Sequence, residues 1–227
     1  GFYEKAVALE PSHGRDIAVM RRQARRNLDA LKAPRDRFEI VLAVGGVACF
    51  TGHRVDEPGR QPPRFSRARV AIVASCIRKA LDHANVRFGF SSAAGGADIL
   101  FIEQLLARGG EPTIFLPFPA EDFVSTSVGG EWRERFYAVL ARPEVTVHVI
   151  EAAKPADPAL ENAAYARCNA RIQAAAVEAG RVYDETPVLI AVLRQGEEEA
   201  KTGGTAEAVR QWEEQLSGKL VLIDPQE

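Results

Sequence analysis

From residue 39 onward, short apolar runs alternate with longer amphipathic stretches, and this alternation constrains the fold more than any other feature. The apolar runs have strand length and are rich in β-branched residues without regular polar alternation, which is typical of strands covered on both faces. They are residues 44–51, 86–91, 111–116, 145–150, 188–193 and 220–223. The stretches between them have helical periodicity. They are residues 66–83, 98–108, 131–141, 159–179 and 206–217. Such strand–helix–strand alternation predicts an α/β fold with a Rossmann-like, doubly wound, mainly parallel sheet of about six strands.

Residues 1–38 follow a different pattern, and we expect them to form a helical extension of the domain at 39–227. A short helix ends at Pro11, and a second helix is predicted from Asp16 to Leu31. The phrase Ala6–Pro11 resembles the last helix of a tetratricopeptide repeat. Because one partial repeat cannot stabilise itself, we interpret it as the tail of an upstream helical or repeat region of the same chain. Residues 33–36 are a candidate linker.

The charge is distributed unevenly along the chain. Residues 1–38 carry nine Lys or Arg against five Asp or Glu, so with a whole-chain charge of −2 the remainder carries −6. The basic cluster is Arg21, Arg22, Arg25 and Arg26. Either it forms a solvated helix face, or it binds RNA or a partner protein. The overall balance gives no broad basic field, so we do not expect the main domain to bind nucleic acid.

The cysteines and histidines indicate neither a metal site nor a disulfide framework. Cys49, Cys76 and Cys168 are odd in number, far apart and set in apolar surroundings, as expected for core residues in a reducing, cytoplasmic compartment. The histidines form no metal-binding pair, and no apolar run approaches the ~20 residues of a membrane span. The chain opens at Gly1 without Met or a signal-peptide pattern, and we expect it to be a piece of a longer protein.

Ligands of open parallel sheets bind beyond the carboxyl ends of the strands, so the residues after each strand are the first candidates for a site. After the first strand come Thr51, Gly52, His53 and Arg54. Gly52 permits a sharp turn and a close approach to a ligand. Arg54 is a forked donor for phosphate or carboxylate, and His53 could donate to an anion or act in acid–base chemistry. The alternative is a tight turn with a surface arginine.

The second strand is followed by a loop of small residues that includes Ser91, Ser92, Gly95 and Gly96. Small side chains leave main-chain amides bare before a helix, which predicts an anion site. Asp98 could cap that helix or accept hydrogen bonds from ribose hydroxyls. The loop is neither GxGxxG nor a P-loop, and it lacks the P-loop lysine, which argues against an NTPase.

Three further segments carry candidate residues. After the third strand, Pro117 stiffens a turn, and Phe118 could stack on a base or lie in the core. Asn169 has poor propensity for its Ala-rich helix, which indicates a hydrogen-bonding role. The fifth strand is followed by a second glycine-rich helix start with Gly203, Gly204 and Thr205, where Thr205 can cap the helix and the amides can hold phosphate. Loops of this kind after several strands predict one shared anion site.

At these loops the chain resembles the SLOG superfamily of Rossmann-like domains, named for its Smf/DprA and LOG members, over roughly residues 44–224. Residues 51–54, Thr-Gly-His-Arg, resemble a phrase of its YpsA-like branch. Residues 91–98 resemble the second-strand loop of many members, residues 116–118 the Leu-Pro-Phe phrase, and residues 203–205 the Gly-Gly-Thr helix start. The helical N-terminus resembles the repeat regions that precede such domains in bacterial multidomain proteins.

The resemblance implies a pocket for nucleotides or nucleotide derivatives. We therefore expect a regulatory module that binds or senses a phosphate-bearing small molecule, with no required cofactor. Some members cleave nucleoside monophosphates at the N-glycosidic bond, and for that alternative the candidate carboxylates are Asp98, Glu121 and Glu207. Glu207 lies two residues after Thr205, where the hydrolase motif places a glutamate at three, which argues against this activity. The helix at 159–179 could serve a homo-oligomer or simply pack in the core.

Overall fold

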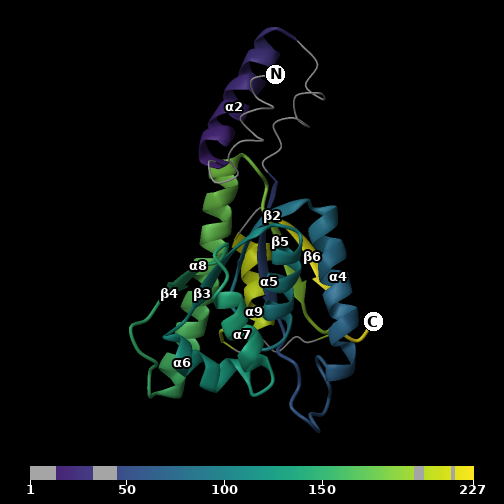
Figure 1. The fold of residues 1–227 in the computed structure, drawn as a ribbon, viewed down its shortest axis with the longest axis vertical. Coiled ribbons are helices and arrows are strands. Elements are labelled where there is room, and N and C mark those ends of the chain that lie inside the picture. The colour runs from purple at the N-terminus through teal and green to yellow at the C-terminus, as the bar shows by residue number, and fades with distance from the viewer. Residues whose placement is uncertain (1–13, 33–44, 197–201, 216–217) are drawn as a thin grey trace.

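The computed structural model describes residues 14–32, 45–196, 202–215 and 218–227. The expected first helix, the repeat-like phrase Ala6–Pro11 and the candidate linker at 33–36 lie outside the described residues. Within them, six strands form one sheet in which all neighbours run parallel, in the order β4-β3-β2-β1-β5-β6 (Figure 1). The strands are β1 (Gly46–Gly52), β2 (Val86–Ser91), β3 (Glu111–Leu116), β4 (Thr146–Val149), β5 (Val188–Val192) and β6 (Lys219–Ile223).

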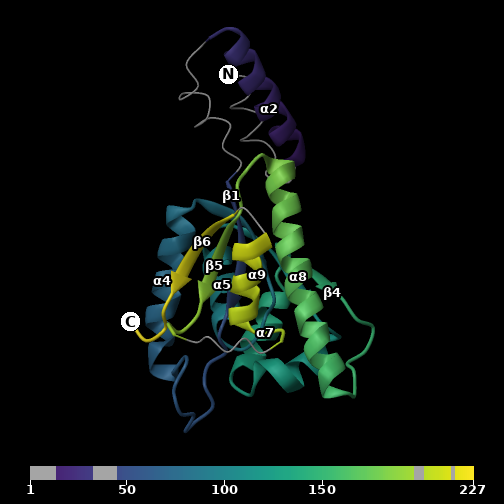
Figure 2. The same cartoon turned by 180° about the vertical axis from the view of Figure 1, so that it is seen from behind.

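Helices cover both faces of this sheet, which confirms the predicted Rossmann-like, doubly wound architecture. One face is covered by α4 (Val70–His83), α5 (Ala97–Ala107) and α7 (Trp132–Leu140), and α4 is preceded by a 3-10 turn, η2 (Arg67–Arg69). The opposite face is covered by α8 (Pro158–Tyr183) and α9 (Thr205–Gln215), which lie in front in Figure 2. Successive side chains of β1 point to opposite faces of the sheet. Phe50 therefore packs in the core beneath α4, α5 and α7, and Cys49 packs in the core beneath α8 and α9.

The strand order reverses between β1 and β5. Strands β1 to β4 succeed one another toward one edge, whereas β5 pairs with the other side of β1 and continues to β6. Chain connections therefore leave the carboxyl ends of β1 and β5 in opposite directions, which opens a crevice where ligands of such sheets bind.

Two local predictions need correction. All four residues of β4 are exposed, including Val147 and Val149, because β4 is an edge strand that the helical layers do not cover on both faces. The segment after β3 is also more ordered than expected. It forms a short helix, α6 (Ala120–Phe123), and a π-helical segment, η3 (Val124–Val128), which the proline-rich phrase before them does not signal.

The basic cluster contacts the chain's own longest helix. In α2 (Gly14–Ala30), Arg22 donates to the carbonyl oxygens of Arg181 and Val182 at 3.1 and 3.2 Å, and Arg21 donates to Tyr183 O at 3.0 Å. Cations stabilise the C-terminal end of a helix, where carbonyl oxygens lack partners within the helix. Binding to this end of α8 therefore explains the positive charge of Arg21 and Arg22. Figures 1 and 2 show α2 stacked on this end of α8.

The ion pairs of α2 strengthen the same contact. Arg21 lies 2.7 Å from the carboxylate of Glu185, and Arg25 pairs with Asp184 just beyond the end of α8. Neither the solvated-face interpretation nor the partner-patch interpretation anticipates this intramolecular role. In the described parts of the chain, no helix combines the length and the apolar character that crossing a bilayer requires.

Candidate functional site

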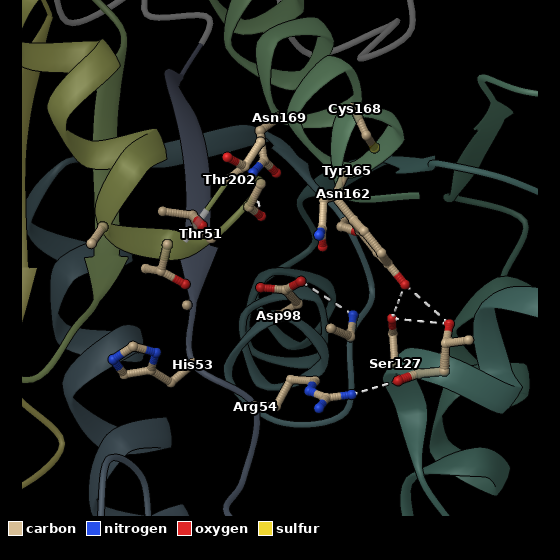
Figure 3. A pocket seen from close by; sticks show the side chains of 18 of the residues that line it. Thr51, His53, Arg54, Asp98, Ser127, Asn162, Tyr165, Cys168, Asn169 and Thr202 are labelled. Carbon is tan, nitrogen blue, oxygen red and sulfur yellow. Dashed lines mark hydrogen bonds between the residues drawn. The ribbon is translucent and has the colours of Figure 1, made fainter. Parts of the chain in front are cut away.

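A cavity of about 440 Å³ lies at the carboxyl end of the sheet, beside the switch point between β1 and β5. Its wall comes from the loop after β1, the start of α5, the segment η3, the N-terminal half of α8 and the start of α9 (Figure 3). These segments are far apart in the sequence, and the parallel topology brings them together. Ten of the fifteen residues predicted from sequence line this cavity: Thr51, Gly52, His53, Arg54, Ser92, Asp98, Asn169, Gly203, Gly204 and Thr205.

The other five predicted residues lie outside the cavity wall. Ser91, Pro117 and Phe118 are buried, and Phe118 packs edge-on against Tyr165 in the core. Gly95 and Gly96 form a close backbone junction with the loop after β1 and with η3, and Gly95 lines a neighbouring cavity.

This junction explains the two glycines by packing. The Gly95 amide donates to Ser127 O at 2.9 Å, and a Cβ on Gly95 would lie 1.9 Å from Val128 O. Gly96 has a φ of +144°, and its Cβ would lie 2.6 Å from Val55 N. The Ala97 amide donates to His53 O at 3.1 Å. The amides of residues 95 and 97 are thus used within the protein, which corrects the sequence-based picture of bare amides at this helix start.

Asp98 lies near the centre of the cavity in Figure 3. The residue is 6% exposed, and its carboxylate accepts from the Ala94 amide at 3.1 Å. Burial raises the pKa of Asp98 to about 7, against the lowering effect of hydrogen bonds from the Ala94 and Gly52 amides. The N-cap of α5 is Gly96, so Asp98 is not its cap. A buried carboxyl that titrates near neutral pH in a cavity is typical of a functional site.

Arg54 lies where the cavity meets the π-helical segment. Its backbone forms an isolated bridge with Gly96, and its Nη1 donates to Thr126 O at 2.6 Å. The residue is exposed, so a guanidinium of fixed direction faces solvent at the cavity wall. Such a group can form paired hydrogen bonds with a phosphate or carboxylate.

His53 has a structural partner. Its Nε2 accepts from the Arg194 amide at 3.3 Å, and its own amide donates to Val192 O at 3.0 Å. The side chain is 5% exposed. His53 therefore ties the ends of β1 and β5 together, and with Nε2 accepting, a neutral ring carries its proton on Nδ1.

The start of α9 is held in place by two side chains. Asn169 donates from Nδ2 to Gly203 O at 3.0 Å, and Glu207 accepts from the Gly203 amide at 2.5 Å. Gly203 has a φ of +79°, which favours glycine, and a Cβ there would lie 2.6 Å from Tyr165 Cβ. The hydrogen-bonding role inferred for Asn169 is thus directed at this loop, and Glu207 closes the turn.

A cluster of hydroxyl groups forms the wall opposite the start of α9. The Tyr165 hydroxyl lies 2.7 Å from Ser127 Oγ and 3.0 Å from Thr126 Oγ1 (Figure 3). Tyr165 comes from α8, which begins at Pro158 with Asp157 as its cap. The cluster therefore joins α8 to η3 and offers exchangeable donors and acceptors beside the cavity.

Several lining residues were missed by the sequence reasoning, and one group had a detectable signal. On α8 the lining residues share one helical face: Pro158, Glu161, Asn162, Tyr165, Cys168 and Asn169. Residues three, four and seven apart lie on the same face of a helix. Once Asn169 is placed at the carboxyl end of the sheet, this spacing predicts the other lining residues of the helix. Thr126 and Ser127 gave no such signal, because a π-helical segment has no simple pattern. Among the described residues, no cluster of three His, Cys, Asp or Glu could hold a metal ion.

Cys168 is an inert part of the wall. Its thiol donates to Phe115 O at 3.4 Å, and burial together with the nearby Asp98 raises its pKa to about 12. A thiol with this pKa is not a nucleophile at neutral pH. Of the other carboxylates considered for catalysis, Glu121 is exposed and lies outside the cavity wall.

No protein-family model and no curated protein matches the chain. Among solved structures, the chain is similar to the X-ray structure of DNA processing protein A (DprA) from Streptococcus pneumoniae, at 15% identity and a TM-score of 0.38. The match covers 78% of this chain and 58% of that one. The chain is also similar to the Moco carrier protein from Chlamydomonas reinhardtii, at 12% identity and a TM-score of 0.32, covering 80% and 91%. Both TM-scores lie below 0.5, so function is argued below from the cavity.

The Gly95 junction predicts a specific loss of stability. We expect Gly95→Ala to lower the free energy of unfolding by about 1–3 kcal/mol, because the new Cβ collides with the backbone of Val128. Gly130→Ala is the matched control, since a Cβ there meets nothing within 4 Å. Urea unfolding of both variants measures the difference, and equal stabilities would contradict the assigned contact.

Asp98 predicts a pH dependence of stability. The ordinary pKa of an aspartate side chain is 3.8, and that of folded Asp98 is about 7, so between these values only the folded state keeps the proton. This group therefore makes the free energy of unfolding fall as pH rises from about 4 to about 7. In Asp98→Asn that contribution is absent, and the variant should gain stability relative to the wild type over this interval. A constant difference between the two proteins from pH 4 to pH 8 would refute the raised pKa.

Proposed function

We propose that this domain binds a nucleotide-derived, phosphate-bearing small molecule in the cavity and acts as a regulatory module of a larger bacterial protein of the SLOG superfamily, YpsA-like branch. The observation that carries the proposal is the convergence of Arg54, Asp98 and the start of α9 on one cavity at the topological switch point. This position is where open parallel sheets bind nucleotides. The phrases at 51–54, 91–98 and 203–205 that resemble the superfamily contribute to the same wall, whereas the Leu-Pro-Phe phrase at 116–118 does not.

The phosphate belongs between Arg54 and the N-terminus of α9. Helix α9 has 11 residues and begins at Thr205, directly after the two glycines of the loop. A helix N-terminus carries partial positive charge and favours an anion, and Arg54 adds a full charge. At the start of α9 the Gly203 amide donates to Glu207. The start of α5 is still the weaker candidate, because both its Gly95 and its Ala97 amide already donate within the protein.

The sugar belongs near Asp98. An ionised carboxylate accepts two hydrogen bonds from neighbouring hydroxyls, and the Tyr165–Ser127 pair supplies further donors on the facing wall. Since Asp98 titrates near pH 7, a ribose that donates to it prefers the ionised form. The proposal thus places the sugar beside Asp98 at the centre of the cavity, next to the phosphate.

Helix α8 provides the route from the ligand to the rest of the protein. Its N-terminal half lines the cavity with Tyr165 and Asn169, and its C-terminal end holds α2 through Arg21 and Arg22. A ligand that binds more tightly to one of two positions of α8 shifts the equilibrium between them, and α2 moves with α8. The size of the shift is set by the difference between the two affinities. The helical extension is the partner that such a module would regulate.

A second candidate function is hydrolysis of an N-glycosidic bond, and the protonation of Asp98 favours it. Water would add across the C1′–N bond of a nucleoside monophosphate, giving the free base and ribose 5-phosphate. A protonated carboxyl beside the glycosidic bond can donate its proton to the departing base as a general acid. Glu207 is committed to Gly203 and Glu121 lies outside the wall, which leaves Asp98 as the candidate. Chromatography after incubation with nucleoside monophosphates detects the free base, and no release by the wild type would exclude this activity for those substrates.

Calorimetry with adenosine monophosphate tests the binding function. We expect Arg54→Ala to weaken binding roughly 10- to 100-fold, because a hydrogen bond to a charged group contributes about 1.5–3 kcal/mol. Arg142→Ala is the matched control, since Arg142 is exposed and pairs with Glu144, and neither residue lines the cavity. No binding by the wild type, or equal binding by Arg54→Ala, would reject the proposal.

The pH dependence of binding tests the sugar position. The affinity for adenosine monophosphate should rise as pH increases through about 7, because Asp98 ionises and becomes a better acceptor. The Asp98→Asn side chain has the same shape but does not titrate. Dividing the wild-type affinity by that of Asp98→Asn at each pH therefore cancels the effect of the titration of the ligand's own phosphate. A ratio that does not change between pH 6 and pH 8 would show that Asp98 does not accept from the sugar.

A further inference from the structure

A second cavity of about 780 Å³ lies next to the first. It is formed by the loop that follows Arg54 and by the segment that connects η3 to α7. Arg54, Thr126 and Ser127 line both cavities, so the two spaces share one wall. Of the residues predicted from sequence, Arg54 and Gly95 line this second space.

The shared wall is a fixed partition. Arg54 donates to Thr126 O at 2.6 Å, Gly95 donates to Ser127 O at 2.9 Å, and the Tyr165 hydroxyl lies 2.7 Å from Ser127 Oγ. Three separate elements therefore hold the π-helical segment at this point. The exposed guanidinium of Arg54 borders both cavities, so one phosphate group on Arg54 could carry a substituent into each.

An indole side chain forms part of the wall of the second cavity. Trp132 lies in its wall and is 5% exposed, and its Nε1 has no hydrogen-bond partner within the described parts of the chain. An indole N–H is a donor and never an acceptor. Because Nε1 itself is sealed from solvent, an occupant of the cavity contacts other atoms of the Trp132 side chain.

The charges of the second cavity are balanced. Arg60 lies 3.3 Å from Asp56, and Arg67 pairs with Glu131. The side chain of Asp56 is 7% exposed and accepts from the amides of residues 64 and 65 at 2.7 and 2.8 Å, which fixes the loop. With its basic groups paired in this way, the space favours a polar, uncharged group over a second anion.

We infer that the ligand is a two-part molecule, in which phosphate at Arg54 links a nucleoside in the first cavity to a second uncharged group in the second. This inference rests on the proposed function and specifies its ligand class. A mononucleotide fills one cavity, whereas two nucleosides joined through a pyrophosphate fill both. The partition residues Thr126 and Ser127 then face the linkage.

Calorimetry with two probes tests the inference. The probes are adenosine monophosphate and diadenosine diphosphate, in which two adenosines are joined by a pyrophosphate. We expect the wild type to bind diadenosine diphosphate at least tenfold more tightly. Gly130 lines the second cavity, and a Cβ there meets nothing within 4 Å, so Gly130→Phe should fill the space and abolish the preference while leaving the monophosphate affinity unchanged. Gly130→Ala is the matched control and should keep the preference.

Tryptophan fluorescence supplies an independent readout. Diadenosine diphosphate should change the emission of Trp132, and the change should vanish in Trp132→Phe, which retains Trp212 in the other core. Equal affinity of the wild type for both probes, or an unchanged preference in folded Gly130→Phe, overturns the two-part ligand but leaves the first cavity in place. Binding of neither probe overturns the inference together with the proposed function.

Discussion

The close backbone approach between the end of β1 and the start of α5 is the constraint on which the site depends. Gly96 lets the loop pass within contact distance of Arg54 and Val55, and the amide of Ala97 donates to His53 O. Gly95 extends the same contact to η3. These hydrogen bonds fix three chain segments relative to one another, so Arg54 and Asp98 have defined positions before any ligand binds. Such preorganisation lowers the cost of ordering a site on binding.

The proposed binding of a ligand depends on one buried carboxyl, that of Asp98. Asp98 would be better solvated at the surface, and its raised pKa measures the free energy that burial costs its charged form. Packing does not require an ionisable group there, since the neighbouring residues of α5 are apolar and buried. The Asp98 carboxylate accepts from the Ala94 and Gly52 amides, which ties α5 to the loops around it. We propose that it also accepts from the hydroxyl groups of an anionic ligand held by Arg54 and helix α9.

The sequence predicted the sheet and the convergence of strand-end loops on one cavity well, because both follow from simple periodicities. Apolar runs of strand length revealed every described strand, and the strand-end rule brought Thr51, Asp98 and Gly204 to one cavity. The exposed β4 was misjudged, because an apolar run does not reveal whether its strand lies at an edge. The glycines at 95 and 96 were misjudged because small residues permit a close approach to protein backbone as readily as to an anion. The sequence did not predict the π-helical segment η3, since no residue spacing marks such a segment.

A titration of the ¹⁵N-labelled protein with adenosine monophosphate, followed by amide NMR shifts, tests the central claim most directly. The account predicts that the largest shifts fall on residues 51–54, 98 and 203–206, which line the first cavity. Residues around Arg142 and β4, at the far edge of the sheet, should stay unchanged. Shifts confined to surfaces outside the cavity wall, or no shift at all, would contradict the account.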